Sequence, residues 1–301
     1  MRVSVGITIY NSERTIAQTI KSVFAQTFQD WELILAEDGS TDDSLAICRS
    51  IKDPRVRVLS DGENHGTEYR LNQINRLARG EYIARLDSDD LMHPERLARQ
   101  VEYLDAHPDV DLVGCALYLI DADNNITGLR HTEPMDPSLG AVVKYGLIQQ
   151  PSATARADWF RNNPYDLRYI AAEDHELWCR TCTTSKFAKL QQPLLYYRET
   201  HKAPWPYLKR YARHCWAKSK CYAVYGPPSL GWPGTLKLMV VNYAKLGAYA
   251  LATFCGAQDQ IVKRRYALPA AESDMQTATE GLQIIEGTNV PGMLEEQYQA
   301  I

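Results

Sequence analysis

Acidic side chains gather directly after two hydrophobic segments of this 301-residue chain, residues 31–36 and 82–86. They are Glu37, Asp38, Asp87, Asp89 and Asp90. Carboxylates that lie so close together repel one another unless a cation or hydrogen-bond donors stand among them. Because Mg²⁺ and Mn²⁺ prefer oxygen ligands, the three carboxylates within residues 87–90 predict a divalent cation site. The alternative is a solvated acidic turn with helix caps.

Alternating strand and helix patterns would place these carboxylates at one edge of a sheet. Strand-like segments alternate with segments whose apolar residues recur at helical spacing, and residues 3–10 are uncharged and β-branched, as is typical of a buried strand. The predicted strands are 3–10, 31–36, 56–60 and 82–86, and the predicted helices are 44–51, 66–78, 94–106 and one capped by Asn11 and Ser12. Such crossovers predict an α/β fold with a mostly parallel sheet and helices on both faces. Ligands of such sheets bind beyond the carboxyl ends of the strands.

The motifs at these strand ends resemble the family 2 inverting glycosyltransferases, which are nucleotide-sugar enzymes of the GT-A fold. The resemblance covers roughly residues 1–201. The segments that carry it are 3–11, 37–42, 80–90, the pair Glu173-Asp174 with Leu177 and Trp178, and the closing Tyr197, Arg198 and His201. The chain departs from the family pattern at Glu37, where aspartate is frequent, and at Arg70, where a small residue is frequent and to which we assign no role.

The resemblance implies a site for a nucleotide sugar and a divalent metal, Mn²⁺ or Mg²⁺. The implied nucleotide-sugar ligands are Thr8, Tyr10, Glu13, Asp38, Gly39, Asp87 and Ser88, and the implied metal ligands are Asp89, Asp87 and His201, with an ordinary loop histidine as the alternative for His201. Asp38 would accept a hydrogen bond from the imide N–H of uracil, which cytosine lacks, and this favours a UDP-sugar. The cation would neutralise charge on the departing diphosphate.

The resemblance also implies the catalytic pair. Asp174 would be the general base that takes the proton of the acceptor hydroxyl as the sugar is transferred with inversion, because an aspartate is ionised at neutral pH. Glu173 would orient the acceptor or the local helix terminus. The structural alternative is that both acids only favour the positive end of a helix dipole.

Charge is uneven along the chain. Residues 202–265 hold 11 basic residues and one acid, residues 266–301 hold six acids and no base, and residues 1–201 carry a net charge of −8. We therefore expect a catalytic domain over 1–201 (about 1–90 for the nucleotide sugar, 91–201 for the acceptor), a basic helical segment and an acidic tail. The tail's role stays open.

The basic segment predicts a helix pair with two alternative uses. Between residues 205 and 225 one helical face carries aromatic and apolar residues, and lysines and arginines lie roughly opposite, as in an interfacial membrane element. The family resemblance implies that such an element would suit a glycan acceptor on a polyprenyl lipid, as in bacterial surface polysaccharide synthesis. The alternative is packing on the catalytic domain or on a second subunit of a homo-oligomer. We expect no transmembrane span and no nucleic-acid partner.

Composition bounds the remaining possibilities. With 45% hydrophobic and 23% charged residues, the chain is globular rather than disordered or coiled-coil. We expect the seven cysteines, including Cys179 and Cys182, to be reduced thiols of a cytoplasmic protein. Residues 149–154 precede a predicted edge strand and could line the acceptor site. A sugar nucleotidyltransferase and a non-catalytic nucleotide-sugar binding module are the alternative functions.

Overall fold

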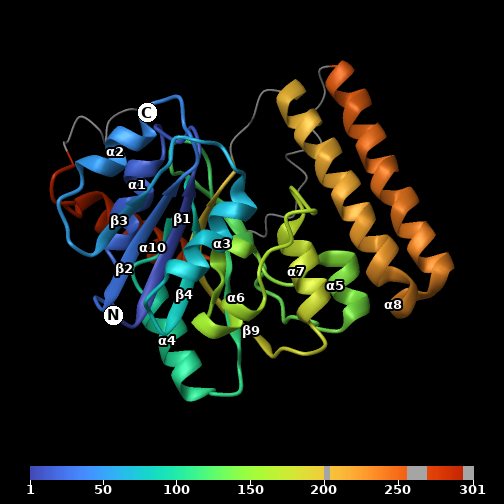
Figure 1. Ribbon diagram of the computed structural model, residues 1–301, viewed down its shortest axis with the longest axis horizontal. Coiled ribbons are helices and arrows are strands. Elements are labelled where there is room, and N and C mark those ends of the chain that lie inside the picture. Colours follow the sequence, from blue (N-terminus) through green and yellow to red (C-terminus); the bar gives the residue numbers. More distant parts are fainter. Residues whose placement is uncertain (200–203, 256–269, 294–301) are drawn as a thin grey trace.

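One mixed sheet runs through the centre of the computed structural model, which describes residues 1–199, 204–255 and 270–293 (Figure 1). The strands are β1 (Val3–Ile9), β2 (Trp31–Glu37), β3 (Val56–Leu59), β4 (Tyr82–Asp87), β5 (Leu91–Met92), β6 (Leu112–Ile120), β7 (Ile126–Arg130), β8 (Thr154–Arg156) and β9 (Phe187–Arg198). The helices are α1 (Ile16–Phe24), α2 (Ser44–Ser50), α3 (Thr67–Leu77), α4 (Arg96–Ala106), α5 (Leu139–Tyr145), α6 (Ala157–Asn162), α7 (Glu173–Thr181), α8 (Pro204–Phe254) and α10 (Glu272–Gly287), with a 3-10 turn at Gln150–Ser152.

The strand order is β3-β2-β1-β4-β8-β6-β9-β5, with β7 beside β6. The four predicted strands form its parallel part, since β2 and β4 flank β1 and β3 flanks β2. The second half is mixed, because β8 runs antiparallel to both β4 and β6. The prediction of an edge strand directly after residues 149–154 was wrong: β8 is interior, and Thr154 and Ala155 are fully buried. Strand β8 has only three residues, and so short a pattern in the sequence does not show that other strands flank it on both sides.

Helices cover both faces of the sheet, as predicted. Alternate apolar residues of β1 pack with α1, α2 and α4, whereas Ile34 and Ile83 pack with α3, α5, α6 and α7 on the opposite face. Gly6 lets α3 approach β1 closely, because a β-carbon there would lie 2.5 Å from Ile74 Cγ2. The two hydrophobic clusters fix the sheet and thereby the loops at its carboxyl edge.

The first helix begins later than predicted. Its N-cap is Thr15, which makes no side-chain capping bond, and α1 starts at Ile16. Asn11 instead adopts a left-handed φ of 49°, and its Oδ1 accepts a hydrogen bond from the Thr41 backbone N–H at 2.8 Å. The predicted cap therefore ties the β1 loop to the β2 loop, a long-range contact that competes with local capping.

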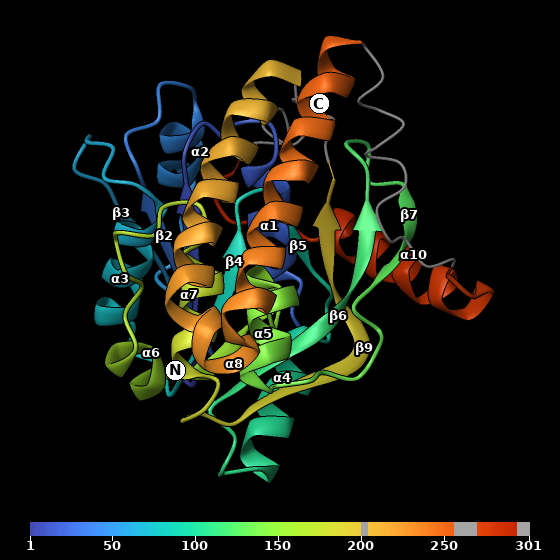
Figure 2. The ribbon, with the colours of Figure 1, turned by 90° about the vertical axis from the view of Figure 1, so that its right-hand side faces the viewer.

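The C-terminal part forms a helical hairpin and a returning helix. The chain turns at Gly231 (φ 68°) inside α8, so that residues 204–230 and 232–254 form two arms side by side (Figure 2). The arms approach closely at Gly226, where a β-carbon would lie 2.5 Å from Thr235 Oγ1. Helix α10 packs on the sheet, where the Tyr196 hydroxyl donates to the Ala278 carbonyl at 2.7 Å. No helix in the described ranges is long and apolar enough to cross a membrane.

All seven cysteines are free in the structure, and six of them are buried. Cys179 and Cys182 are buried on and after α7. Burial raises the pKa of the Cys182 thiol, so this side chain is a core residue rather than a reactive one.

Candidate active site

The carboxyl ends of β1 and β4 open into a cleft of about 840 Å³. The predicted residues that line it are Thr8, Tyr10, Glu13, Asp38, Asp87, Ser88, Asp89 and Glu173. Asp174 lines a neighbouring cavity. Gly39 shapes the β2 loop, since it has φ 71° and a β-carbon there would lie 2.9 Å from the Asn64 nitrogen. His201 lies outside the described residues.

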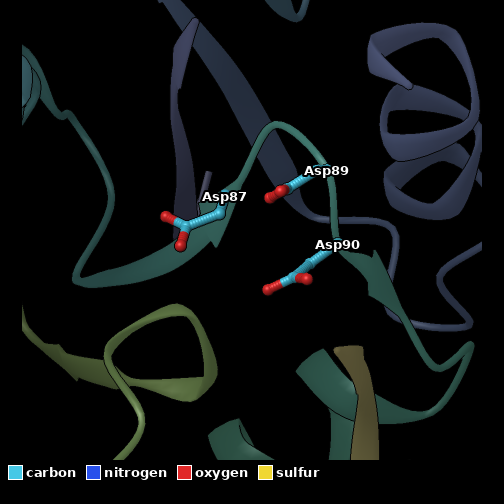
Figure 3. Close-up of side chains that lie close together, drawn as sticks. All are labelled: Asp87, Asp89 and Asp90. Carbon is cyan, nitrogen blue, oxygen red and sulfur yellow. The ribbon is translucent and has the colours of Figure 1, made fainter. Parts of the chain in front are cut away.

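The loop between β4 and β5 carries three carboxylates that could hold a metal ion. One oxygen each of Asp87, Asp89 and Asp90 lies within 4.8 Å of the others, and all three carboxylates lie on one side of the loop (Figure 3). Asp90 Oδ1 accepts a hydrogen bond from the Arg198 N–H at 2.9 Å, whereas its buried Oδ2 has no partner among the described residues. Burial and the neighbouring carboxylates raise the pKa of Asp90. A divalent cation would satisfy these oxygens.

Two arginines hold this loop in place. Arg85 is fully buried, and its guanidinium donates to Asp87 Oδ1 at 2.9 Å and to the Gly6 carbonyl at 3.1 Å. Arg198 Nε donates to the Asp89 carbonyl at 2.8 Å. Both arginines therefore fix where the acidic loop points, although no pattern in the sequence indicated this role for Arg85.

The loop that leads into α3, together with Arg70 of α3, holds the Asp38 carboxylate in place. Its Oδ1 accepts hydrogen bonds from the His65 N–H at 2.8 Å and from Arg70 Nε at 2.9 Å, and its Oδ2 accepts one from the Gly66 N–H at 3.0 Å. A carboxylate offers about four acceptor positions, so these three donors leave one on Oδ2. Arg70, which the sequence left without a role, is the buried partner of this carboxylate.

Replacing Arg70 by methionine should lower both stability and UDP affinity. Removing one partner of a buried ion pair leaves the Asp38 charge half-paired, and we expect a loss of about 3 kcal/mol in the free energy of unfolding. We also expect UDP to bind about tenfold more weakly, because the carboxylate that faces the cleft loses its fixed orientation. Urea unfolding and calorimetric titration with UDP check the two effects, with the exposed Arg76→Met on the same helix as control. Unchanged UDP affinity would separate Asp38 from nucleotide binding.

Hydrogen bonds made by residues that line the cleft connect the loops around it. Glu13 Oε2 accepts a hydrogen bond from the Asp43 N–H at 3.1 Å, and the Glu13 N–H donates to Asp42 Oδ2 at 3.0 Å. The hydroxyls of Ser12 and Ser88 lie 2.7 Å apart. The loops after β1, β2 and β4 therefore act as one unit, and Glu13 supports the start of α2 as well as lining the cleft.

Glu173 and Asp174 begin α7, and a residue with an unusual backbone conformation lies two positions before Glu173. Ala171 has φ 68°, its N–H donates to Glu68 Oε1 at 3.2 Å, and its carbonyl accepts a hydrogen bond from His214 Nδ1 at 2.7 Å. A non-glycine residue in this region is held there by its surroundings. These contacts from α3 and α8 set the position of the acidic pair.

Burial raises the pKa of both acids. The pKa of Glu173 lies well above its usual value, mainly because the side chain is buried and then because the Asp174 and Glu68 carboxylates are nearby. For Asp174 burial is again the main cause, and the hydrogen bond from the His175 N–H together with the nearby Lys218 opposes it. Shifted carboxylates in a cleft mark a candidate catalytic site.

A second cavity of about 330 Å³ lies on the other side of this pair. Asp174 and Gln149 line it, whereas Glu173 and Gln150 line the larger cleft. Its other polar lining residues include His131, Glu133, His175, Trp178, Lys189, His214 and Lys218. The buried His175 Nε2 and Trp178 Nε1 have no hydrogen-bond partner in the part of the chain that the structure describes. Buried polar atoms of this kind are normally satisfied by water or by a ligand.

The first arm of α8 supplies basic, aromatic and histidine side chains that the sequence did not assign to the site. Tyr207, Arg210 and Arg213 line the large cleft, and His214 and Lys218 line the second cavity. Their charge was visible in the sequence, but neither alternative use of the basic segment, membrane contact or packing on a protein surface, assigned them to the cleft. Arginines in the same cleft as Asp87 and Asp89 would balance the charge of a diphosphate.

Comparison with known proteins shows which family this arrangement represents. Residues 4–172 match the family model described as glycosyl transferase family 2. The putative glycosyltransferase EpsE of Bacillus subtilis is 34% identical over 187 residues, which cover 60% of this chain and 66% of EpsE. WfaP of Escherichia coli, a UDP-Glc:alpha-D-GlcNAc-diphosphoundecaprenol beta-1,3-glucosyltransferase, is 31% identical over 176 residues, which cover 58% of this chain and 68% of WfaP. The matches thus span about two thirds of each relative's length.

Solved structures support the same fold. The Staphylococcus aureus protein TarS (residues 1–349) in complex with UDP aligns with a TM-score of 0.57 and 20% identity, over 75% of this chain and 70% of that chain. The mannosyltransferase PcManGT of Pyrobaculum calidifontis, in complex with GDP-Man and Mn²⁺, aligns with a TM-score of 0.58 and 16% identity, over 95% and 86% of the two chains. The sequence resemblance is thereby confirmed: the chain belongs to glycosyl transferase family 2, and it is a glycosyltransferase with a GT-A fold.

Proposed function

We propose that this enzyme transfers a sugar from a UDP-sugar to a hydroxyl of a glycan acceptor, with a divalent metal and with inversion at the anomeric carbon. The observation that carries the proposal is the shared cleft: Asp38, the three-aspartate loop and Glu173 all border it or lie directly beside it. Asp38 would accept the uracil imide N–H on Oδ2. Two supporting facts come from relatives, since WfaP is named for a UDP-glucose donor and TarS is solved with UDP.

The residues present fit a divalent metal. Asp89 and Asp87 would bind it, as the sequence predicts, and the buried Asp90 offers an oxygen with no other partner among the described residues. When bound, Mn²⁺ or Mg²⁺ would neutralise the diphosphate charge. PcManGT, a structural relative, is solved with Mn²⁺. Arg210 and Arg213 would add cationic side chains to the lining of the same cleft.

Asp174 would serve as the general base. The support for this role is that Asp174 lines the second cavity while its sequence neighbour Glu173 lines the donor cleft. Its carboxylate would take the proton of the attacking hydroxyl, and Lys218 and His214 would favour its ionised form. Glu173 would orient the acceptor or the start of α7.

The second cavity would hold the acceptor sugar. Its unpartnered His175 and Trp178 nitrogens suit sugar hydroxyls, because a neutral imidazole both donates and accepts and an indole N–H donates. Burial lowers the pKa of His175 to about 3, so its ring is neutral at physiological pH. We propose a glycan or polyprenyl-linked glycan as the acceptor, a class to which the named acceptor of WfaP belongs. Contact with the cytoplasmic face of a membrane would bring the enzyme to such an acceptor.

A thermal-shift panel of nucleotide sugars with and without Mn²⁺ tests the donor proposal. UDP-sugars with Mn²⁺ should raise Tm by roughly 5 °C at a hundredfold excess over Kd, because a ligand that binds only the folded state adds about 2.7 kcal/mol. CMP-sugars should give no shift, and EDTA should remove the UDP-sugar effect. A shift with GDP-sugars alone, or one that EDTA leaves unchanged, would contradict the proposed donor or the proposed metal respectively.

A further inference from the structure

The second arm of the α8 hairpin, residues 232–254, which we call the outer arm, turns polar side chains toward the protein and apolar ones toward solvent. Its most buried side chains are polar or hydroxylated: Thr235 is fully buried, and Asn242, Tyr249 and Thr253 are buried as well. Leu238 and Met239 are half-buried and pack on the core cluster that includes α5 and α7. In a helix of a globular protein the apolar face is normally turned inward and the polar face outward. Here much of the apolar surface faces away from the protein.

The exposed apolar residues of this arm follow helical spacing. They are Trp232, Leu236, Val240, Tyr243, Leu251 and Phe254, with exposed fractions between 45% and 80%. The intervals of three, four or eight residues place them on one side of the helix, which we call the outer stripe. At 1.5 Å per residue the stripe is about 33 Å long. Figure 1 shows this arm, in orange, on the outer side of the first arm. Scattered exposed apolar residues are ordinary, but a continuous stripe marks an interaction surface.

Hydrogen bonds within the hairpin explain how the polar residues can face inward. Asn242 Nδ2 donates to the Cys215 carbonyl at 2.8 Å and to Ser219 Oγ at 3.1 Å. Aromatic rings also join the arms, since the Tyr207 and Tyr249 centroids lie 5.0 Å apart. The buried polar groups are thereby satisfied, and the arms are held together without the outer stripe. The stripe is therefore available to another partner.

The first arm adds positive charge to the same exposed surface. Lys209 and Lys220 recur at helical spacing with Trp216, which is 59% exposed, and Lys220 Nζ lies 3.5 Å from the Trp216 ring centroid. The exposed Lys237 adds a cation beside the outer stripe. Figure 2 looks onto both arms from the side away from the sheet. Apolar side chains with tryptophans and interspersed lysines are the composition that anionic lipid interfaces bind.

We propose that the α8 hairpin lies in the interface of an anionic lipid bilayer through its outer stripe, flanked by the basic residues of the first arm. The stripe would enter the boundary between headgroups and acyl chains, and the lysines would contact lipid phosphates. This corrects the sequence-based view of the first helix, because Cys215 and Tyr222 of its expected apolar face are buried in the protein. The inner face of that arm lines the cleft and the second cavity, so lipid binding would place both at the membrane surface.

Vesicle cosedimentation of the full chain tests this proposal. Vesicles of phosphatidylglycerol and phosphatidylcholine should bind the enzyme, and the triple variant Trp232→Ser, Leu236→Ser, Val240→Ser should bind at least about tenfold more weakly. The control variant Leu77→Ser, Ile284→Ser removes exposed apolar side chains from α3 and α10 and should bind as wild type does. Lys209→Gln with Lys237→Gln should weaken binding to the anionic vesicles by about tenfold or more at low salt, and much less at high salt.

Several outcomes would overturn the proposal. Wild-type protein that fails to cosediment excludes a lipid partner, and so does a triple variant that binds like the control. If the wild type does not bind vesicles but forms a dimer in sedimentation equilibrium, and the triple variant is monomeric, the stripe binds a second copy of this chain.

The inference bears on the acceptor class proposed above, but vesicle binding is measured without substrate. Failure of the donor proposal would appear in the thermal-shift panel and leave vesicle binding unchanged. Equal Tm values of triple variant and wild type exclude misfolding as the cause of lost binding, and transfer to a water-soluble acceptor provides a second check on the fold.

Discussion

Replacing Asp89 by alanine should abolish sugar transfer and the metal-dependent part of UDP binding. Asp89 is one of three carboxylates whose oxygens lie within 4.8 Å of one another, and its removal leaves too few oxygen ligands in the described part of the site to hold a divalent ion against water. The loss of charge stabilisation on the diphosphate amounts to several kcal/mol, so we expect turnover to fall by about 10³-fold or more. Steady-state kinetics and UDP titrations with and without Mn²⁺ measure the two effects.

A control separates this effect from a general loss of acidic charge. Asp158 carries an 86% exposed carboxylate on α6, and Asp158→Ala should retain wild-type activity. Asp89→Ala should keep the wild-type fold, because the loop is also held by Arg85 and Arg198. If Asp89→Ala binds UDP in the presence of Mn²⁺ as tightly as the wild type does, Asp89 is not a metal ligand.

Replacing Asp174 by asparagine should remove transfer and leave donor binding intact. A general base contributes roughly 10²–10⁴-fold to rate, so we expect kcat to fall within that range while Kd for the UDP-sugar stays unchanged. The reason is positional, since Asp174 lines the second cavity and not the donor cleft. Single-turnover kinetics with calorimetric donor titration distinguish the two steps. A variant that turns over at the wild-type rate would exclude Asp174 as the base, and a variant that loses donor binding would indicate a different role.

The same residue predicts a pH dependence whose sign follows from its environment. Burial raises the pKa of Asp174 above 3.8, so the carboxylate becomes protonated at a higher pH than an exposed aspartate. The base must be ionised, and the acidic limb of the rate profile should therefore lie above pH 3.8, with kcat rising as pH increases through the raised pKa. Lys218→Met should move this limb to higher pH, because the nearby cation favours the ionised form. Lys218→Arg should restore the limb.

Stability should respond to Asp174→Asn in the opposite direction from activity. A group whose pKa is higher in the folded than in the unfolded state destabilises the fold at pH values above both, because the unfolded state holds the charge more easily. Asparagine removes that charge, so Tm at about pH 8 should equal or exceed the wild-type value. A lower Tm would show that the ionised carboxylate makes stabilising contacts that offset its burial.

Local patterns in the sequence predicted the parallel half of the sheet because its strands are buried on both faces. Strand β1 has no charged residue and β2 has only Glu32 before its terminal Glu37, so the acids that follow them stand out. Parallel strands carry their carboxyl ends to one edge, so the residues after β1, β2 and β4 had to meet there. The amino-acid sequence was therefore sufficient to place Asp38, Asp87 and Asp89 in one site.

Other parts of the site depend on contacts between residues far apart in the chain, which local periodicity does not encode. Arg70 reaches Asp38 across 32 positions, and His214 reaches the Ala171 carbonyl across 43. The position of β8 inside the sheet and the return of α10 to Tyr196 are further examples. Sequence alone determined that residues 202–265 are basic and helical in pattern. Only the tertiary structure decided which side of each arm faces the cleft and which faces solvent, because that depends on how the hairpin packs against α5 and α7.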